Sequence, residues 1–594
     1  MKGFAFLLLP ATLLTVDATM AVDYVIVGAG TSGLVIANRL SQNKNITVAL
    51  IDPGSDERGN PTVSDPSEWL KLQQTPINWN YTSVSQETAN GRAIPYPAGK
   101  GIGGTSLMNG MTYLRGDKAE FDAWEELGNP GWNWNSLFAK YKEIEKFFPP
   151  QAWQEEIGAS YEPSLHGYDG NLHVGFPPTL EKGLYGNFSK AWKALGYKKV
   201  QDPNGGSVAG FSVWPMTLDP KQNHRSDAAT SFYWPIQPLR ENLSLIKGTA
   251  TKILWGKAGC TSKRPGKVAQ GVQYLDADGA LSQITAKKEV ILSAGALRTP
   301  LILERSGVGN PKILSPLGIE TVIDAPTVGE NLIDQPNLAI IYGSNDNTTG
   351  TTPYATFAST EDLFGKTNAG ALASSTKERL AAWAKDIETQ TNGALKAAAL
   401  EKQFAIQHKV IFQDKVTTAE ILTAALGSAL VTVSWALLPF SRGSVHLTSA
   451  SDTDIDKPVI NPRLLSNDFD MQVQIASCKL SRKLWQTAPA DTLVTAPVVP
   501  SLDQVPLNAS DSQWEAFIRA TYQSNSHSLG TAAMMAKDLG GVVDPELRVY
   551  GAANVRVVDA SVLPTQFSGH LTATLYAVAD RAARMIQLND GLAA

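Results

Sequence analysis

The stretch that decides the fold is residues 22–39, which reads V-D-Y-V-I-V-G-A-G-T-S-G-L-V-I-A-N-R. Its apolar run at residues 25–27 has no polar face, as a strand buried inside a parallel sheet requires. Gly28, Gly30 and Gly33 follow with the spacing G-x-G-x-x-G. These glycines allow a tight turn, a close approach of the backbone to a pyrophosphate, and close packing of a helix on a strand. We therefore predict a strand, a turn and a helix that bind a dinucleotide.

A second strand makes this prediction more specific. Residues 47–51 are apolar and end at Asp52, where an acidic side chain accepts hydrogen bonds from ribose hydroxyls. The pyrophosphate would lie at the N-terminus of the helix, against Thr31 and Ser32. Glycine-rich turns also occur without a ligand, so the order of strand, glycines, helix, strand and acid carries the prediction. That order does not distinguish FAD from NAD.

The composition excludes several classes of protein. The chain has 594 residues, of which 43% are hydrophobic and 18% charged, as in soluble globular proteins of more than one domain. Its net charge of −5 provides no basic field for nucleic acid. Its two cysteines, Cys260 and Cys478, are too few for a disulfide scaffold or a cysteine-based metal site. We expect no metal, and two small buried side chains, although a bridge between the cysteines stays open.

The N-terminus has the features of a signal peptide, which we predict over residues 1–20. Lys2 precedes an apolar core at residues 4–14, and small residues follow at Ala18 and Ala21. A membrane anchor is the weaker interpretation, because the apolar core is too short to span a bilayer. We therefore expect a secreted protein.

Six N-x-S/T sequons fit a secreted chain. We discount Asn45 because it lies close to the second predicted strand. The expected glycosylation sites are Asn80, Asn187, Asn242, Asn347 and Asn508.

Residues 421–440 are a second apolar stretch that could be mistaken for a membrane span. Gly427, the interspersed Ser and Thr residues and a β-branched second half predict a helix followed by a strand in the core. We expect no stable insertion into a membrane.

Two further motifs carry a resemblance to a known family. Residues 99–122 begin G-K-G-I-G-G-T-S-L-M-N-G-M-T-Y-L-R-G, and residues 295–309 read G-A-L-R-T-P-L-I-L-E-R-S-G-V-G. They resemble the first and second signatures of the glucose-methanol-choline (GMC) oxidoreductases, in the right order. With the C-terminal block, the resemblance covers nearly the whole chain after the signal peptide. It implies FAD rather than NAD.

The resemblance also implies an α/β fold with two domains. A Rossmann-type FAD-binding domain would comprise residues 22–117, 228–332 and 543–590. A discontinuous α+β substrate domain, built on an antiparallel sheet, would comprise residues 118–227 and 333–542. Residues 345–418 turn from polar to alanine-rich and helical, and such proteins vary most in this substrate-facing part.

The resemblance assigns residues to the cofactor. Thr105, Asn109, Gly110 and Thr112 would line the flavin and the pyrophosphate. The backbone at Thr251 would lie against the adenine. Asp559 and Ala560 would end a strand that closes the site, and a helix starting near Leu571 would direct its N-terminus at the flavin pyrimidine.

Two histidines in glycine-bounded loops match the paired active-site positions of the family. His527 lies in Y-Q-S-N-S-H-S-L-G and His570 in S-G-H-L-T. Oxidation of an alcohol requires a base for the hydroxyl proton while a hydride passes to flavin N5, and a neutral imidazole is suitable. We assign His527 as this base and His570 as the group that binds the substrate oxygen and shares the proton. His166, His173 and His224 are expected to be structural.

The substrate is the least determined feature. The chain most resembles secreted fungal FAD-dependent glucose dehydrogenases and glucose oxidases, and it retains Asn525. Those enzymes carry an arginine where this chain has Gln523 and an acid where it has Val433. Because a sugar pocket needs such groups to pair with hydroxyls, we expect an aryl, allylic or secondary-metabolite alcohol instead.

Two alternatives stay open. One is a glucose or other sugar dehydrogenase or oxidase whose sugar contacts have moved, and the other is a non-redox cyclase or lyase of the same fold. The retention of both histidines favours redox chemistry. The electron acceptor would be oxygen or a quinone-type compound, and the protein a monomer or homodimer.

Overall fold

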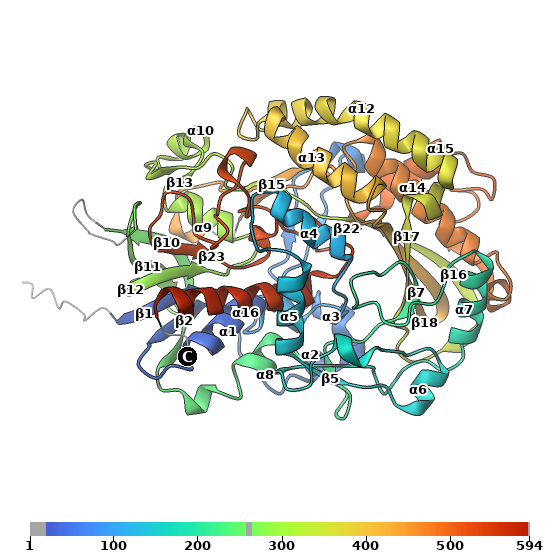
Figure 1. Cartoon of the computed structure of the whole chain (residues 1–594), viewed down its shortest axis with the longest axis horizontal. Helices are drawn as coiled ribbons and strands as arrows, with labels where there is room; N and C mark the ends of the chain where they lie inside the picture. The colour runs from blue at the N-terminus through green and yellow to red at the C-terminus, as the bar shows by residue number, and fades with distance from the viewer. Residues whose placement is uncertain (1–19, 257–263, 455–456, 592–594) are drawn as a thin grey trace, which may run out of the picture.

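The computed structural model describes residues 20–256, 264–454 and 457–591. Nearly all of the predicted signal peptide, and Cys260, lie outside these residues. The chain forms two sheets at opposite ends of the molecule, with helices around and between them (Figure 1). The expected α/β fold with a Rossmann-type unit and a second, antiparallel sheet is confirmed.

The first sheet, here called the nucleotide sheet, is mainly parallel. Its parallel strands run in the order β10, β2, β1, β12, β23, and β11 pairs antiparallel with both β10 and β12. Val25 lies opposite Ala49 on one side and Val290 on the other, so the first apolar strand is central and fully buried. The strands are β1 (Ala21–Val27), β2 (Val48–Asp52), β10 (Leu243–Trp255), β11 (Ala269–Asp276), β12 (Leu281–Leu292) and β23 (Val555–Val557).

Helices α1 (Thr31–Leu40) and α16 (Leu571–Asn589) pack against each other beside the nucleotide sheet. The N-terminal end of α16 lies near the middle of the molecule, between the two sheets (Figure 1). Helices from the first and the last parts of the described chain therefore lie in the same layer.

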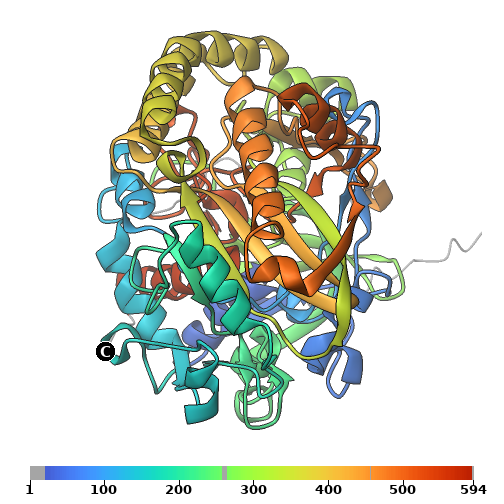
Figure 2. The ribbon, with the colours of Figure 1, turned by 90° about the vertical axis from the view of Figure 1, so that its right-hand side faces the viewer.

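The second sheet, here called the substrate sheet, is antiparallel. Its strands run in the order β21, β16, β18, β17, β7, and β22 also pairs with β16. Helix α14 (Asp468–Leu484) lies across its outer face (Figure 2). The strands are β7 (Gly210–Val213), β16 (Pro336–Thr348), β17 (Tyr354–Ser359), β18 (Thr417–Ala436), β21 (Val494–Val499) and β22 (Gln523–Ser524).

Residues 421–440 do not form the predicted helix and strand. They belong largely to β18, a single strand whose first half pairs with β17 and whose second half pairs with β16. The alanines favour a helix locally, but pairing on both sides of the strand overrides that preference. Gly427, with φ +63°, lies where the pairing changes from one neighbour to the other. No helix within the described residues is long and apolar enough to cross a membrane.

The remaining helices and strands lie around and between the two sheets. Residues 345–418 are helical in α11, α12 and α13, as expected, with β17 among them. The other helices are α2 (Pro61–Ser64), α3 (Trp69–Leu72), α4 (Lys118–Glu126), α5 (Trp134–Ile144), α6 (Ala152–Glu156), α7 (Tyr185–Ala194), α8 (Ala228–Phe232), α9 (Thr299–Arg305), α10 (Pro311–Leu314), α11 (Thr360–Phe364), α12 (Lys366–Gln390), α13 (Ala397–Phe412) and α15 (Asp511–Thr521). The other strands are β3 (Tyr81–Thr82), β4 (Pro95–Tyr96), β5 (Glu145–Phe148), β6 (Leu172–Gly175), β8 (Leu218–Asp219), β9 (His224–Arg225), β13 (Val308–Gly309), β14 (Ile323–Asp324), β15 (Glu330–Leu332), β19 (Gly443–His446) and β20 (Val459–Asn461).

The structure shows the surroundings of a histidine and a cysteine predicted to be structural, and of two sequon asparagines. His166 is buried between the carboxylates of Glu145 and Asp202, and Cys478 is a buried free thiol. Asn45 is exposed, so its closeness to β2 does not hide it. The Nδ2 atom of Asn242, to which a glycan would attach, donates to three main-chain carbonyls, which speaks against glycosylation there.

Candidate active site

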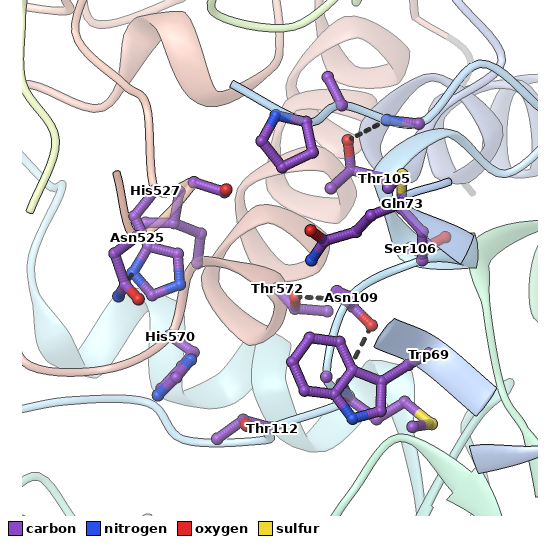
Figure 3. A pocket seen from close by; sticks show the side chains of 18 of the residues that line it. Trp69, Gln73, Thr105, Ser106, Asn109, Thr112, Asn525, His527, His570 and Thr572 are labelled. Carbon is purple, nitrogen blue, oxygen red and sulfur yellow. Dashed lines mark hydrogen bonds between the residues drawn. The ribbon is translucent and has the colours of Figure 1, made fainter. Parts of the chain in front are cut away.

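A cavity of about 1290 Å³ lies between the two sheets and is lined by residues from both. The nucleotide sheet and α1 contribute Gly28, Gly30 and Asp52, and the C-terminal loops contribute His527 and His570. Figure 3 shows the two histidines with Asn525 on one side of the cavity, and Trp69 and Asn109 on the other. The predicted dinucleotide turn and the predicted histidines therefore share one cavity.

Packing explains the glycines of the turn. Gly28 has φ +105°, and a Cβ atom there would lie 2.3 Å from the carbonyl oxygen of Ser293. A Cβ atom on Gly33 would lie 1.9 Å from the carbonyl oxygen of Gly28. Gly30 is the N-cap of α1, and no side chain accepts a hydrogen bond there. The uncapped N–H groups of α1, beside the cavity-lining residues Thr31 and Ser32, suit an anion such as a pyrophosphate.

Asp52 is held at the cavity wall by the main chain. One carboxylate oxygen accepts from the N–H of Ala29 and the other from the N–H of Gly54, both at 2.7 Å. Burial raises the pKa of this carboxyl group, and the two N–H donors and Arg298 oppose that rise. Each oxygen keeps a lone pair that can accept a ribose hydroxyl.

Most of the other residues assigned to the cofactor line the same cavity. They are Thr105, Asn109, Gly110, Thr112, Asp559, Ala560 and Leu571. Asn109 donates from Nδ2 to the Thr572 hydroxyl at 3.0 Å. The carboxylate of Asp559 instead binds the protein, accepting from the Gly295 N–H at 2.9 Å and from the Thr299 hydroxyl at 2.6 Å.

The position predicted for the adenine contact lies at an irregular point of β10. Ala250 lines the cavity, and the pairing of β10 with β11 shifts its register between Ala250 and Lys252. Thr251 is fully buried, and its hydroxyl donates to the Gln273 carbonyl of β11 at 3.2 Å. The contact of the Thr251 backbone with the adenine stays a prediction.

Hydrogen bonds fix the ring of His527. Its Nδ1 lies 2.7 Å from the side-chain oxygen of Gln335, whose amide nitrogen donates to the carbonyl oxygen of Leu437 at 2.9 Å. Because a carbonyl oxygen only accepts, the amide of Gln335 has one orientation, and its oxygen would repel an unprotonated Nδ1 at this distance. We therefore assign the proton to Nδ1; Asn525 Nδ2, which lies 3.0 Å from Nδ1, then donates to the oxygen of Gln335 instead. Nε2 of His527 is therefore the ring nitrogen left to act as a base.

The loop that carries His527 is tied to the end of β15. The main-chain N–H of His527 donates to a carboxylate oxygen of Asp334 at 3.0 Å, and the hydroxyl of Ser524 donates to the other oxygen. Burial raises the pKa of Asp334 to about 6, against the effect of these donors. Asn525 donates to Gln335 and accepts from Asn337, so the polar groups around His527 are interconnected.

His570 is the N-cap residue of α16, and a buried glutamate contacts it. Its Nε2 lies 3.2 Å from a carboxyl oxygen of Glu420 on β18. The two histidine rings lie 4.9 Å apart with their planes at 85°. Burial raises the pKa of Glu420 well above its ordinary value, which favours the protonated carboxyl group.

Burial also keeps both imidazoles neutral. It lowers the pKa of His570 to about 4. It lowers the pKa of His527 well below its ordinary value, and the nearby His570 adds to this effect. A neutral imidazole is the form that accepts a proton, so both rings are ready to act as bases at neutral pH.

Several residues of the site are absent from the sequence predictions. Glu420 is a single acid directly before the apolar stretch at residues 421–440, and an acid in an otherwise apolar strand is the signal that could have found it. Gln335 lies directly before β16 and outside the motifs that carry the sequence predictions. Trp69, in the short helix α3, and Gln73, which follows it, also line the cavity outside those motifs. The predicted residues Gln523, Asn525 and Val433 all line the cavity.

A dinucleotide cradle that opens onto two neutral histidines is the arrangement expected of flavin enzymes that oxidise CH–OH groups. Comparison with known proteins identifies the family. Residues 22–337 and residues 439–579 match the N-terminal and C-terminal models of the GMC oxidoreductases.

Individual relatives agree with the family models. The chain is 46% identical to "Glucose oxidase-like protein fsoC" of Humicola fuscoatra over 95% of each chain. It is 34% identical to a glucose oxidase of Aspergillus carbonarius, over 96% of this chain and 93% of the relative.

Among solved structures, an FAD-dependent oxidoreductase from Chaetomium thermophilum matches with TM-score 0.87 and 29% identity, over 96% of this chain and all of the other. A fungal aryl-alcohol oxidase, of unstated species, matches with TM-score 0.82 and 26% identity, over 96% and 99% of the two chains. The chain therefore belongs to the GMC oxidoreductase family. It is an FAD-dependent oxidoreductase that acts on CH–OH groups, so the predicted family, fold and cofactor are confirmed.

Proposed function

We propose that the protein oxidises a non-sugar alcohol, of the aryl, allylic or secondary-metabolite kind, to a carbonyl compound. The observation that carries this proposal is the apolar wall beside the histidines, where Val433 lies opposite Ala339 on the neighbouring strand. A sugar presents several hydroxyls, and each one left unpaired against such a wall opposes binding.

The chain's own residues supply the proton chemistry. Nε2 of His527 accepts the hydroxyl proton of the alcohol, because Gln335 holds the proton of the ring at Nδ1. His570 hydrogen-bonds the substrate oxygen and shares this proton, so the titration belongs to the pair. FAD, when bound, supplies the acceptor for the hydride. The uncapped N-terminus of α16, at Leu571, favours negative charge in front of it.

The proposal includes the other assignments made from the sequence. The cavity-lining residues named above hold FAD, and Gln523, Asn525 and Val433 contact the substrate. The acceptor of the electrons is oxygen or a quinone-type compound, and the chain is secreted as a monomer or homodimer. Of the five sequons expected to be glycosylated, we propose the three at exposed positions: Asn80, Asn347 and Asn508.

A second candidate is the oxidation of glucose or another sugar. Relatives named glucose oxidase, at 33–34% identity, favour it. A non-redox cyclase or lyase is disfavoured by the two neutral histidines.

The test is anaerobic reduction of the flavin, followed as loss of absorbance near ~450 nm. Benzyl-type and allylic alcohols should bleach the protein rapidly, and glucose and simple polyols slowly or not at all. Rapid bleaching by glucose alone would transfer the assignment to the sugar enzymes. Bleaching by none of these compounds would support the non-redox alternative.

A further inference from the structure

Two neighbouring strands form one wall of the cavity. On β16 and β18, alternate side chains face the cavity, and each lies directly opposite a partner on the other strand. The facing pairs, taken outward from the histidines, are Asn337 with Trp435, Ala339 with Val433, and Ile341 with Val431.

The inner pair of the wall is polar. Asn337 donates to Asn525 at 2.7 Å, and the ring of Trp435 lies 5.9 Å from the ring of His570. The next two pairs carry alkyl groups alone. Because a strand advances about 3.3 Å per residue, the wall runs for about 13 Å from the first pair to the third.

Successive side chains on β18 alternate between the cavity and the face that α14 covers. Thr432 and Ser434 face away from the cavity, under α14, where the hydroxyl of Thr432 accepts from Trp485 at 3.3 Å. Ser434 lies in contact with Cys478 of the same helix. The strand thus places its hydroxyl groups on the covered face and its alkyl groups toward the cavity, the reverse of what a sugar site requires.

The wall continues to the surface. Beyond Val431, the cavity lining includes Leu422, Ala425 and Leu426 of the same strand, and Thr348 of β16, opposite Gly427, adds one hydroxyl group at this end. Leu426 has a relative exposure of 56%, so the apolar lining reaches solvent there. A molecule lying along the wall would have one end at the histidines and the other at the surface.

We propose that this wall, here called the apolar track, binds the tail of an extended, unbranched primary alcohol that enters with its hydroxyl first. This inference rests on the proposed function and names its substrate class as long-chain or polyenyl alcohols. The carbinol carbon loses a hydride to FAD and the hydroxyl loses its proton to His527, which yields the aldehyde. The tail lies against Val433 and Val431, with its far end toward Leu426.

A homologous series tests the track. Holoenzyme is mixed anaerobically with butanol, hexanol, octanol and decanol, and the second-order rate constant of flavin bleaching is measured. Each added methylene should raise this constant about threefold until the track is filled, because burial of a methylene group is favourable. The control compound is butanol, which places its hydroxyl at the same histidines without reaching the outer pair.

A matched set of variants assigns the effect to the wall. Val431→Thr exchanges a methyl group for a hydroxyl group of nearly the same shape, and should lower the octanol-to-butanol ratio about tenfold. The ratio cancels the fraction of active protein, so partial unfolding does not mimic the effect. Val498→Thr makes the same exchange on β21, at a side chain that is 54% exposed and outside the cavity lining, and should keep the wild-type ratio.

The outcomes separate this inference from the proposed function. Bleaching by all four alcohols at one rate overturns the track and leaves the proposed function standing. A rising series that Val431→Thr does not alter overturns the assignment to this wall. Absence of bleaching by these alcohols and by benzyl and allylic alcohols overturns the proposed function and the track together.

Discussion

The side-chain oxygen of Gln335 accepts the Nδ1 proton of His527 across 2.7 Å. Gln335 lies directly before β16 and His527 in a loop almost two hundred positions later, so the state of the base is set by a residue distant in sequence. Which nitrogen of an imidazole carries the proton decides which one can accept another.

Removal of the acceptor at position 335 should impair the base. Gln335→Leu keeps the approximate shape but leaves the Nδ1 proton without a partner, and flavin reduction should slow by about 10² or more. Gln335→Glu keeps an acceptor and should retain activity, while its charge raises the pKa of His527 and moves the acid limb of the pH profile upward. Stopped-flow reduction across pH measures both effects. An unchanged rate and profile in Gln335→Leu would contradict the assignment.

Glu420 should act as a neutral group. Glu420→Gln replaces a protonated carboxyl group by an amide of the same shape, and we expect the free energy of unfolding to change by less than about 1 kcal/mol. Glu420→Ala leaves His570 without its contact and opens a cavity, so it should lose about 2 kcal/mol or more and slow flavin reduction. Chemical denaturation of both variants measures the difference. Equal losses in the two would indicate that the charged form is required.

The pH dependence of flavin reduction should lack the usual step of a free histidine. Burial lowers the pKa of His570 to about 4 and that of His527 well below its ordinary value. A base with a lowered pKa stays unprotonated, so the rate at saturating alcohol should be flat above about pH 6 and fall only toward the folded-state pKa. A midpoint near the ordinary histidine value would show that the rings are more hydrated than this structure indicates.

Charged side chains introduced into the cavity should allow the protein to bind a sugar. Val433→Glu with Gln523→Arg places an acid and a guanidinium group on the cavity lining, and bleaching by glucose should accelerate at least about tenfold. The matched control joins Gln523→Arg to Val498→Glu, which adds the same charges with the acid outside the cavity. No gain over this control would mean that position 433 does not contact the substrate.

His446 should stabilise the fold up to alkaline pH. Its ring contacts Glu304 at 2.7 Å and Glu330 at 3.3 Å, and these carboxylates outweigh burial and raise its pKa to about 10. A folded-state pKa above the unfolded value gives stability that is fully present below pH 6.5 and is lost as pH rises through about 10. His446→Gln should cost about 3 kcal/mol at neutral pH and flatten this dependence. Urea denaturation at several pH values tests it, and equal slopes in both proteins would contradict the charge.

Local patterns were enough for the parts of the fold that depend on neighbouring residues. The strand at residues 25–27 and the glycines after it could be predicted because burial and packing restrict those positions directly. The strand conformation of β18 could not be predicted, since its alanines favour a helix and only pairing with β16 and β17 makes it a strand.

The same distinction applies to the site. His527 and His570 could be predicted because they lie in long motifs, whereas Gln335 and Glu420 act only through contacts between distant strands and loops.

The position of α16 in the cavity wall determines when, during synthesis, the cofactor site is complete. Residues 21–40 leave the ribosome long before residue 555, yet the sheet they start is completed by β23 and the cavity by the N-terminus of α16. At about 5–20 residues per second, β1 waits on the order of a minute for these partners. Cofactor loading must therefore be a late event, and a chain that stops before residue 555 keeps every glycine of the first turn while lacking the wall that would enclose the flavin.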